Sequence, residues 1–198
     1  MKINLKQIYK GLAEWRAERG ITVESQKEGY LVNVMEELGE LATALREYER
    51  FSKPSYPYQK NKKYAEHGII DALCDICVFT INVGADINCN EKLEIINTSQ
   101  TTRCNSSLSF LLSECGNFVY YGKFSSYVCF NQILLSCAKL CEQYGFNFEI
   151  AMLETIKEIS SRTGAYDEKA KKWIKDESDE AKAKWYQANY ELARIKQC

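Results

Sequence analysis

Helix-breaking residues are scarce in this chain of 198 residues, which contains 10 glycines and 2 prolines. Together they make up about 6% of the sequence, roughly half of their usual share. Because so few breakers favour helices, we expect the chain to be all-α. Pro54 and Pro57 lie close together in a polar segment, which predicts a loop there.

Net charge is almost absent as well, because 26 Lys and Arg residues face 27 Asp and Glu residues, giving a formal charge of -1. Such a balance does not suit a protein whose main task is to coat nucleic acid or an anionic membrane. Residues 1–20 are charged and amphipathic, unlike a signal peptide. The sequence has no run of about 20 apolar residues, so it does not predict a membrane span. We therefore expect a cytoplasmic protein whose partners include neither nucleic acid nor a membrane.

The chain contains a single histidine, His67, and 9 cysteines. Cys74, Cys77, Cys137 and Cys141 fall inside apolar, helix-like runs, so we expect them to be reduced and buried. Their spacings, CDIC and CAKLC, leave a zinc site as the alternative, although no turn residues surround them.

Apolar residues recur at helical spacing along most of the sequence, and the length predicts a single domain, 1–198. The strongest pattern is in residues 24–50, and the segment 60–83 is apolar on most sides, as in the middle of a bundle. Tyr166 and Trp173 flank a charged tip, which predicts a small hairpin or an Ω-type loop over 162–176. The helices predicted are 3–19, 24–50, 60–83, 108–120, 126–143, 147–160 and, after the N-cap residue Ser178, 178–196.

An internal similarity suggests that a helix pair is duplicated. Residues 32–45 align with 109–122, and residues 70–87 align with 131–148. The chain then divides into motif-bearing helices (1–96), a degenerate second helix pair (97–150) and a C-terminal part (151–198) that combines the hairpin with the last helix. Most of the acidic residues of the first pair have no acidic counterpart in the second.

Five acidic residues carry the chemistry of the first pair: Glu36, Glu37, Glu40, Asp71 and Asp75. On a helix, Glu37 and Glu40 lie about 60° apart and one turn along, so their carboxylates can converge. Asp71 and Asp75 are also one turn apart, in a stretch too apolar to be a surface. Two such helices packed together would form an all-oxygen site for Mg²⁺, with Mn²⁺ as an alternative. Taken alone, the first acidic group is more typical of a solvated helix face than of a metal site, and the second helix with Asp71 and Asp75 is what favours the metal site.

The motif EELGE (36–40), followed about thirty residues later by IIDALCDICVF, resembles the EExxE…ExxD signature of the all-α nucleoside triphosphate pyrophosphohydrolases. This superfamily includes MazG-like proteins, dimeric dUTPases and dCTP pyrophosphatases. The resemblance covers about residues 5–90 and implies a helical bundle, a divalent cation and subunits that pair as a dimer or tetramer. It makes Glu37, Glu40 and Asp71 the metal ligands and places Glu36 near the attacking water.

The chain departs from this signature at Gly68, where the superfamily has the Glu of ExxD. Loss of one carboxylate predicts weaker ion binding, which Asp75 would offset in part as a catalytic carboxylate. The resemblance further implies a nucleotide pocket, with Trp15 and Asn33 near the base. The downstream segment 156–176 is similar in placement to the phosphate-contacting segment of phage-type members, where Lys157 and Arg162 would contact phosphates.

Three functions remain open at this point. The first is a Mg²⁺-dependent hydrolase that cleaves a nucleoside triphosphate to the monophosphate and pyrophosphate. The second is a catalytically weak protein that binds a nucleotide or an alarmone, and the third is a helical adaptor whose acidic residues are only surface.

Overall fold

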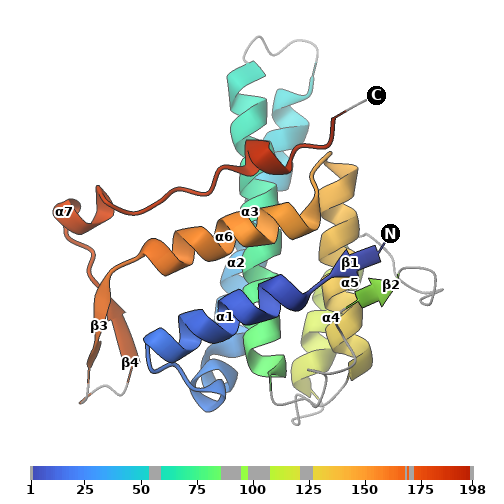
Figure 1. Ribbon diagram of the computed structural model, residues 1–198. Helices are drawn as coiled ribbons and strands as arrows, with labels where there is room; N and C mark the ends of the chain where they lie inside the picture. Colours follow the sequence, from blue (N-terminus) through green and yellow to red (C-terminus); the bar gives the residue numbers. More distant parts are fainter. Residues whose placement is uncertain are drawn as a thin grey trace.

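The computed structural model describes residues 2–53, 59–85, 95–97, 108–120, 127–167, 169 and 172–196. Helices dominate these residues, so the predicted all-α class is confirmed (Figure 1). Strand β1 (Lys2–Asn4) pairs antiparallel with β2 (Ile95–Asn97), and β3 (Gly164–Asp167) pairs antiparallel with β4 (Lys172–Lys175). The helices are α1 (Lys6–Glu18), α2 (Val23–Phe51), α3 (Gln59–Gly84), α4 (Leu108–Tyr120), α5 (Tyr127–Gln143), α6 (Phe148–Ser161), α7 (Asp179–Lys182) and the 3-10 helix η2 (Tyr190–Ala193).

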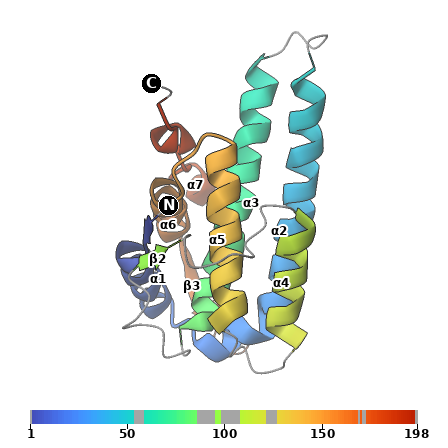
Figure 2. The same cartoon turned by 90° about the vertical axis from the view of Figure 1, so that its right-hand side faces the viewer.

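Helix α3 is the centre of the fold. It runs beside α2 along most of its length, while α5 packs against it on another side with α4 next to α5 (Figure 2). Helices α1 and α6 lie side by side and cross it (Figure 1). By length and hydropathy α3 could cross a membrane, but 72% of its most apolar window is buried inside the molecule. Its apolar composition is therefore explained by its place in the core.

Local signals set the ends of the helices that surround the candidate site. Gly20 has a φ of 62°, a left-handed conformation that suits glycine and turns the chain from α1 into α2. Thr22 then caps α2, because its hydroxyl accepts a hydrogen bond from the backbone N–H of Ser25 at 3.2 Å. Helix α2 continues without a break to Phe51, so Glu36, Glu37 and Glu40 lie on one continuous helix.

One predicted helix is wrong at its N-terminal end, and another is wrong over most of its length. Residues 3–5 are not helical, because Ile3 pairs with Ile96 in the small sheet and α1 starts only at Lys6. The helix predicted over 178–196 is reduced to α7, which Ser178 does cap as predicted. The rest of that segment, apart from η2, is an extended strap (residues 184–196) that lies along α6 and crosses α3 (Figure 1).

Side chains of α6 explain why the strap is not a helix. Its backbone N–H groups at Tyr186, Ala188 and Asn189 donate to Ser161 Oγ at 2.8 Å, Glu158 Oε2 at 2.8 Å and Glu154 Oε2 at 3.1 Å. These groups would otherwise bond to helix carbonyls, so the hydrogen bonds to α6 replace the local ones.

The other predicted features fall as follows. The hairpin is present as β3 and β4, and Cys74, Cys77, Cys137 and Cys141 are free and buried, as predicted. The segments matched in the proposed duplication fall on α2 and α4 and on α3 and α5, and the duplication stays a prediction. Both prolines lie in 54–58, outside the described residues.

Candidate functional site

A cavity of about 670 Å³ opens between the α1–α2 turn, the facing sides of α2 and α3, and the β3–β4 hairpin. Helix α2 contributes Glu36, Glu37 and Glu40 to its wall, and α3 contributes Asp71 and Asp75. We call this cavity the acidic pocket. The two acidic groups that the sequence places on separate helices therefore line one space.

The five carboxylates of the acidic pocket differ in exposure. Glu36 and Glu40 are exposed, whereas Glu37, Asp71 and Asp75 are half-buried. On α3 the residues between the two aspartates, Ala72, Leu73 and Cys74, are fully buried in the core. The aspartates are thus held at the boundary between the apolar interior and the pocket.

Burial and mutual repulsion act together on these carboxylates. Desolvation, with the charges of Glu40, Asp71 and Glu36, raises the pKa of Glu37 from 4.5 to about 7. The pKa of Asp75 is raised well above its usual value by desolvation and by the charges of Asp71 and Glu37. Desolvation also raises the pKa of Asp71. The repulsion among these carboxylates is therefore relieved either by protonation or by a bound cation.

Tyr190, on the strap, orients one of these carboxylates and was not predicted from the sequence. Its hydroxyl donates to Asp71 Oδ1 at 2.6 Å and lies 2.9 Å from the hydroxyl oxygen of Thr155 on α6. This hydrogen bond opposes the desolvation that raises the pKa of Asp71. The buried tyrosine ring thus fixes the direction in which Asp71 faces the pocket.

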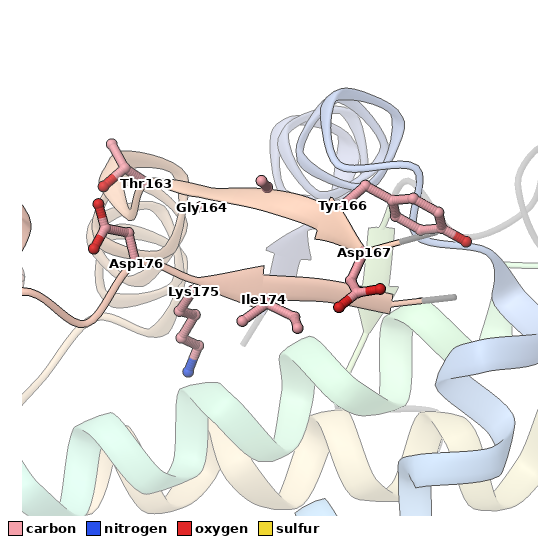
Figure 3. Close-up of a pocket in the computed structure, with 8 residues that line it drawn as sticks. Thr163, Gly164, Tyr166, Asp167, Ile174, Lys175 and Asp176 are labelled. Atoms are coloured by element: carbon pink, nitrogen blue, oxygen red, sulfur yellow. The ribbon is translucent and has the colours of Figure 1, made fainter. Parts of the chain in front are cut away.

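Two cations also line the acidic pocket, Arg162 after α6 and Lys175 on β4. Arg162 donates to Glu158 Oε1 at 2.9 Å, and its charge lowers the pKa of Glu37. In Figure 3 the side chain of Lys175 projects from β4 toward the helices, together with Ile174. Lys175 is a pocket residue that sequence reasoning missed, and the pairing of the two strands brings it there.

Trp15 and Trp173 line one end of the acidic pocket, and Arg19 contacts both rings. Its guanidinium lies 5.6 Å from the ring centre of Trp15 and 5.4 Å from that of Trp173, so it is sandwiched between the two rings. It also donates to the backbone oxygen of Ser160 at 2.8 Å. Trp15 Nε1 donates to the backbone oxygen of Ile159 at 3.2 Å, which leaves the indole ring as an apolar wall.

The predicted nucleotide-binding residues are only partly brought together. Trp15, Asn33 and Arg162 line the acidic pocket, whereas Lys157 does not and instead pairs with Glu154. His67 also lies outside the pocket, 2.7 Å from Glu191 Oε1 on the strap.

Gly68 borders a second, adjoining pocket of about 380 Å³ that is also lined by Glu36, Glu40, Glu47 and Asp71. A Cβ atom at position 68 would lie 3.3 Å from the Cβ of Ala44, a tight but not prohibitive contact. The space that a glutamate side chain would need is therefore present beyond that contact.

The donor set fits a hard divalent cation, because all five acidic side chains offer oxygen ligands. Within the described residues no three side chains of His, Cys, Asp or Glu already converge as a metal-binding group. Comparison with protein-family models, with curated proteins and with solved structures finds no match to this chain.

Proposed function

We propose that this chain is a Mg²⁺-dependent nucleotide pyrophosphohydrolase that cleaves a nucleoside triphosphate between its α and β phosphorus atoms. One observation carries the proposal: five carboxylates from α2 and α3 line a single pocket that Arg162 and Lys175 also line. A pocket that contains both carboxylates and cations suits a metal–polyphosphate ligand, which carries both signs of charge.

In this proposal Glu37, Glu40 and Asp71 hold the cation, and Mn²⁺ would serve in place of Mg²⁺. The bound ion would neutralise phosphate oxygens and lower the pKa of water. Glu36 accepts the proton of the attacking water, whose oxygen bonds to the α phosphorus as the bond to the bridging oxygen breaks. The products are the monophosphate and pyrophosphate, and Arg162 and Lys175 balance the charge on the leaving pyrophosphate.

Asp75 is assigned a supporting catalytic role. It lies one turn from Asp71 and its pKa is raised partly by the charges of Asp71 and Glu37, so it shares their field. Since Gly68 provides no carboxylate, Asp75, which lines the acidic pocket beside Asp71, can supplement the ligand set.

The second candidate is a nucleotide-binding or alarmone-binding protein with weak or no turnover. Gly68 favours this second candidate, because the pocket beside Gly68 lacks the carboxylate that the EExxE…ExxD signature has at this position. Measurements of nucleotide binding and of turnover separate the two candidates, because the second candidate binds a nucleotide but does not cleave it.

The deciding experiment measures products from a panel of nucleoside triphosphates with Mg²⁺. The hydrolase proposal predicts monophosphate and pyrophosphate in equal amounts, and loss of turnover in Asp71→Asn. Glu14→Gln, which removes an exposed acid on α1 that pairs only loosely with Lys10 at 3.7 Å, is the matched control and should retain activity. Nucleotide binding without products would favour the weak binder, and neither binding nor products would leave only the adaptor.

We also propose that two copies of the chain pair through α2. Leu31, Val32 and Met35 are 47%, 71% and 60% exposed, an apolar group on the helix that carries the acidic residues. Light scattering after size exclusion should give twice the mass of one chain, and Met35→Lys should reduce it to one.

A further inference from the structure

Gln26 lies in the second turn of α2 and lines the acidic pocket at the end remote from the acidic residues. Eleven residues separate it from Glu37, about 16 Å along the helix axis. A nucleotide whose phosphates lie at the acidic residues would therefore place its base near Gln26. Trp15 and Phe79 add aromatic walls to the same pocket.

The side-chain amide of Gln26 is held from behind by a chain of hydrogen bonds. Asn82, fully buried on α3, donates from Nδ2 to Gln26 Oε1 at 3.3 Å. Arg16 on α1 donates from its guanidinium to Asn82 Oδ1 at 2.5 Å. Three helices thus contribute one residue each to the chain Arg16–Asn82–Gln26.

The direction of this chain is determined by its first member. A guanidinium can only donate hydrogen bonds, so the oxygen of the Asn82 amide must face Arg16. The Asn82 amide nitrogen then faces Gln26, and the oxygen of Gln26 must face Asn82. Gln26 Nε2 is left without a hydrogen-bond partner among the described residues. The side-chain amide of Gln26 could otherwise take either orientation, but the bond to Asn82 directs its N–H donor to the pocket.

The neighbouring polar side chains do not offer the pocket a donor of fixed orientation. The hydroxyl of Ser25 donates back to the backbone oxygen of Thr22 at 2.8 Å. Asn33 lies seven residues further along α2, about 10 Å nearer the acidic residues, and no described residue fixes the orientation of its amide.

We propose that Gln26 selects the base of the nucleotide, and that Asn82 and Arg16 are positioning residues that make it a donor. A donor at this place accepts the keto oxygen at C4 of uracil or thymine or at C6 of guanine. It leaves the amino group at C4 of cytosine or C6 of adenine facing another donor. This inference rests on the proposed function, because it needs a nucleotide in the pocket.

The test compares dUTP with dCTP, whose bases differ at this edge by a keto oxygen against an amino group. With the wild-type chain and Mg²⁺, we expect dUTP to be preferred over dCTP by about tenfold in kcat/KM, or in affinity if turnover is absent. Guanine and adenine nucleotides should show the same direction.

Two variants should reverse the preference without removing the residue. In Asn82→Asp the new carboxylate still accepts from Arg16, but it attracts Gln26 Nε2 and turns the Gln26 oxygen to the pocket. In Gln26→Glu one new oxygen accepts from Asn82 and the other faces the pocket. Both variants therefore present an acceptor, and dCTP should gain on dUTP. Gln7→Glu, an exposed site on α1, makes the same chemical change outside the pocket and should leave the ratio unchanged.

The outcomes separate this inference from the proposal on which it rests. If the wild type takes both nucleotides equally or prefers dCTP, the assignment of Gln26 is wrong and the hydrolase proposal stands. If Asn82→Asp weakens both nucleotides by the same factor, Asn82 is only structural. If the chain neither binds nor cleaves any nucleotide, the proposed function fails and the inference fails with it.

Discussion

Replacing Glu37 by Gln should stabilise the protein at alkaline pH in the absence of metal. The pKa of Glu37 is raised from 4.5 to about 7 in the folded chain, so folding favours its protonated form. The resulting stabilisation is complete below the unfolded pKa of about 4.5 and is lost as the pH rises through about 7. Gln cannot ionise, so the variant keeps the neutral state at every pH.

The magnitude follows from the pKa. A rise from 4.5 to about 7 corresponds to about 3 kcal/mol, at ~1.4 kcal/mol for each pKa unit. Glu37 is only half-buried, and water screens part of this interaction, so we expect a gain of about 1–2 kcal/mol. The charge of Glu37 also raises the pKa of Asp75, so its removal relieves a second carboxylate in the same direction.

The assay is urea unfolding of the wild type and Glu37→Gln at pH 5 and pH 8, with EDTA or with Mg²⁺. With EDTA the two proteins should be similar at pH 5, and the variant should be more stable at pH 8. Added Mg²⁺ should stabilise the wild type at pH 8 more than the variant, because it binds the folded carboxylates. A variant that is equally or less stable than the wild type at pH 8 in EDTA would refute the reasoning.

Three further predictions concern the surroundings of the acidic pocket. Gly68→Glu should raise Mg²⁺ affinity and turnover over Gly68→Ala, which shares the tight contact with Ala44 but adds no carboxylate; equal Mg²⁺ affinity by calorimetry would argue against a site there. Tyr190→Phe should cost about 1–2 kcal/mol in urea unfolding and weaken Mg²⁺ binding, because it removes the hydrogen bond to Asp71; an unchanged Mg²⁺ affinity would show that the tyrosine does not position Asp71. Glu154→Gln should speed amide hydrogen exchange at Asn189, which donates to this carboxylate, and unchanged exchange there would contradict the account of the strap.

The helices near the site could be predicted because their signals are local. In α2 and α3 the apolar residues repeat at helical spacing, and the acidic residues sit one turn apart on each helix. That Glu37 and Asp71 line one pocket was expected from the same pattern, since two such helices bury their apolar sides together. These features require only the order of residues within one helix.

Lys157 and Arg162 show where that reasoning was incomplete. Lys157 lies within α6, whereas Arg162 follows the last residue of this helix with an extended backbone and lines the acidic pocket. Arg162 faces it, whereas Lys157 pairs with Glu154. Because Arg162 lies beyond the helix, its direction depends on the chain that follows α6 and could not be predicted from helical spacing.

Tyr190 and Lys175 could not have been found in that way. Tyr190 reaches Asp71 across 119 positions of sequence. It does so only because backbone N–H groups of the strap donate to Glu154, Glu158 and Ser161 on α6 and not to carbonyls of a helix. The Ala-rich composition of the segment favours a helix locally, so tertiary contacts outweigh its propensity.

Uptake of Mn²⁺, followed by electron paramagnetic resonance, tests most directly whether α2 and α3 together bind a divalent ion. The wild-type chain should remove free Mn²⁺ from solution, Mg²⁺ should compete for it, and Glu37→Gln and Asp71→Asn should each weaken uptake although they lie on different helices. If the wild type leaves the signal of free Mn²⁺ unchanged, or if only one helix matters, the shared site does not exist.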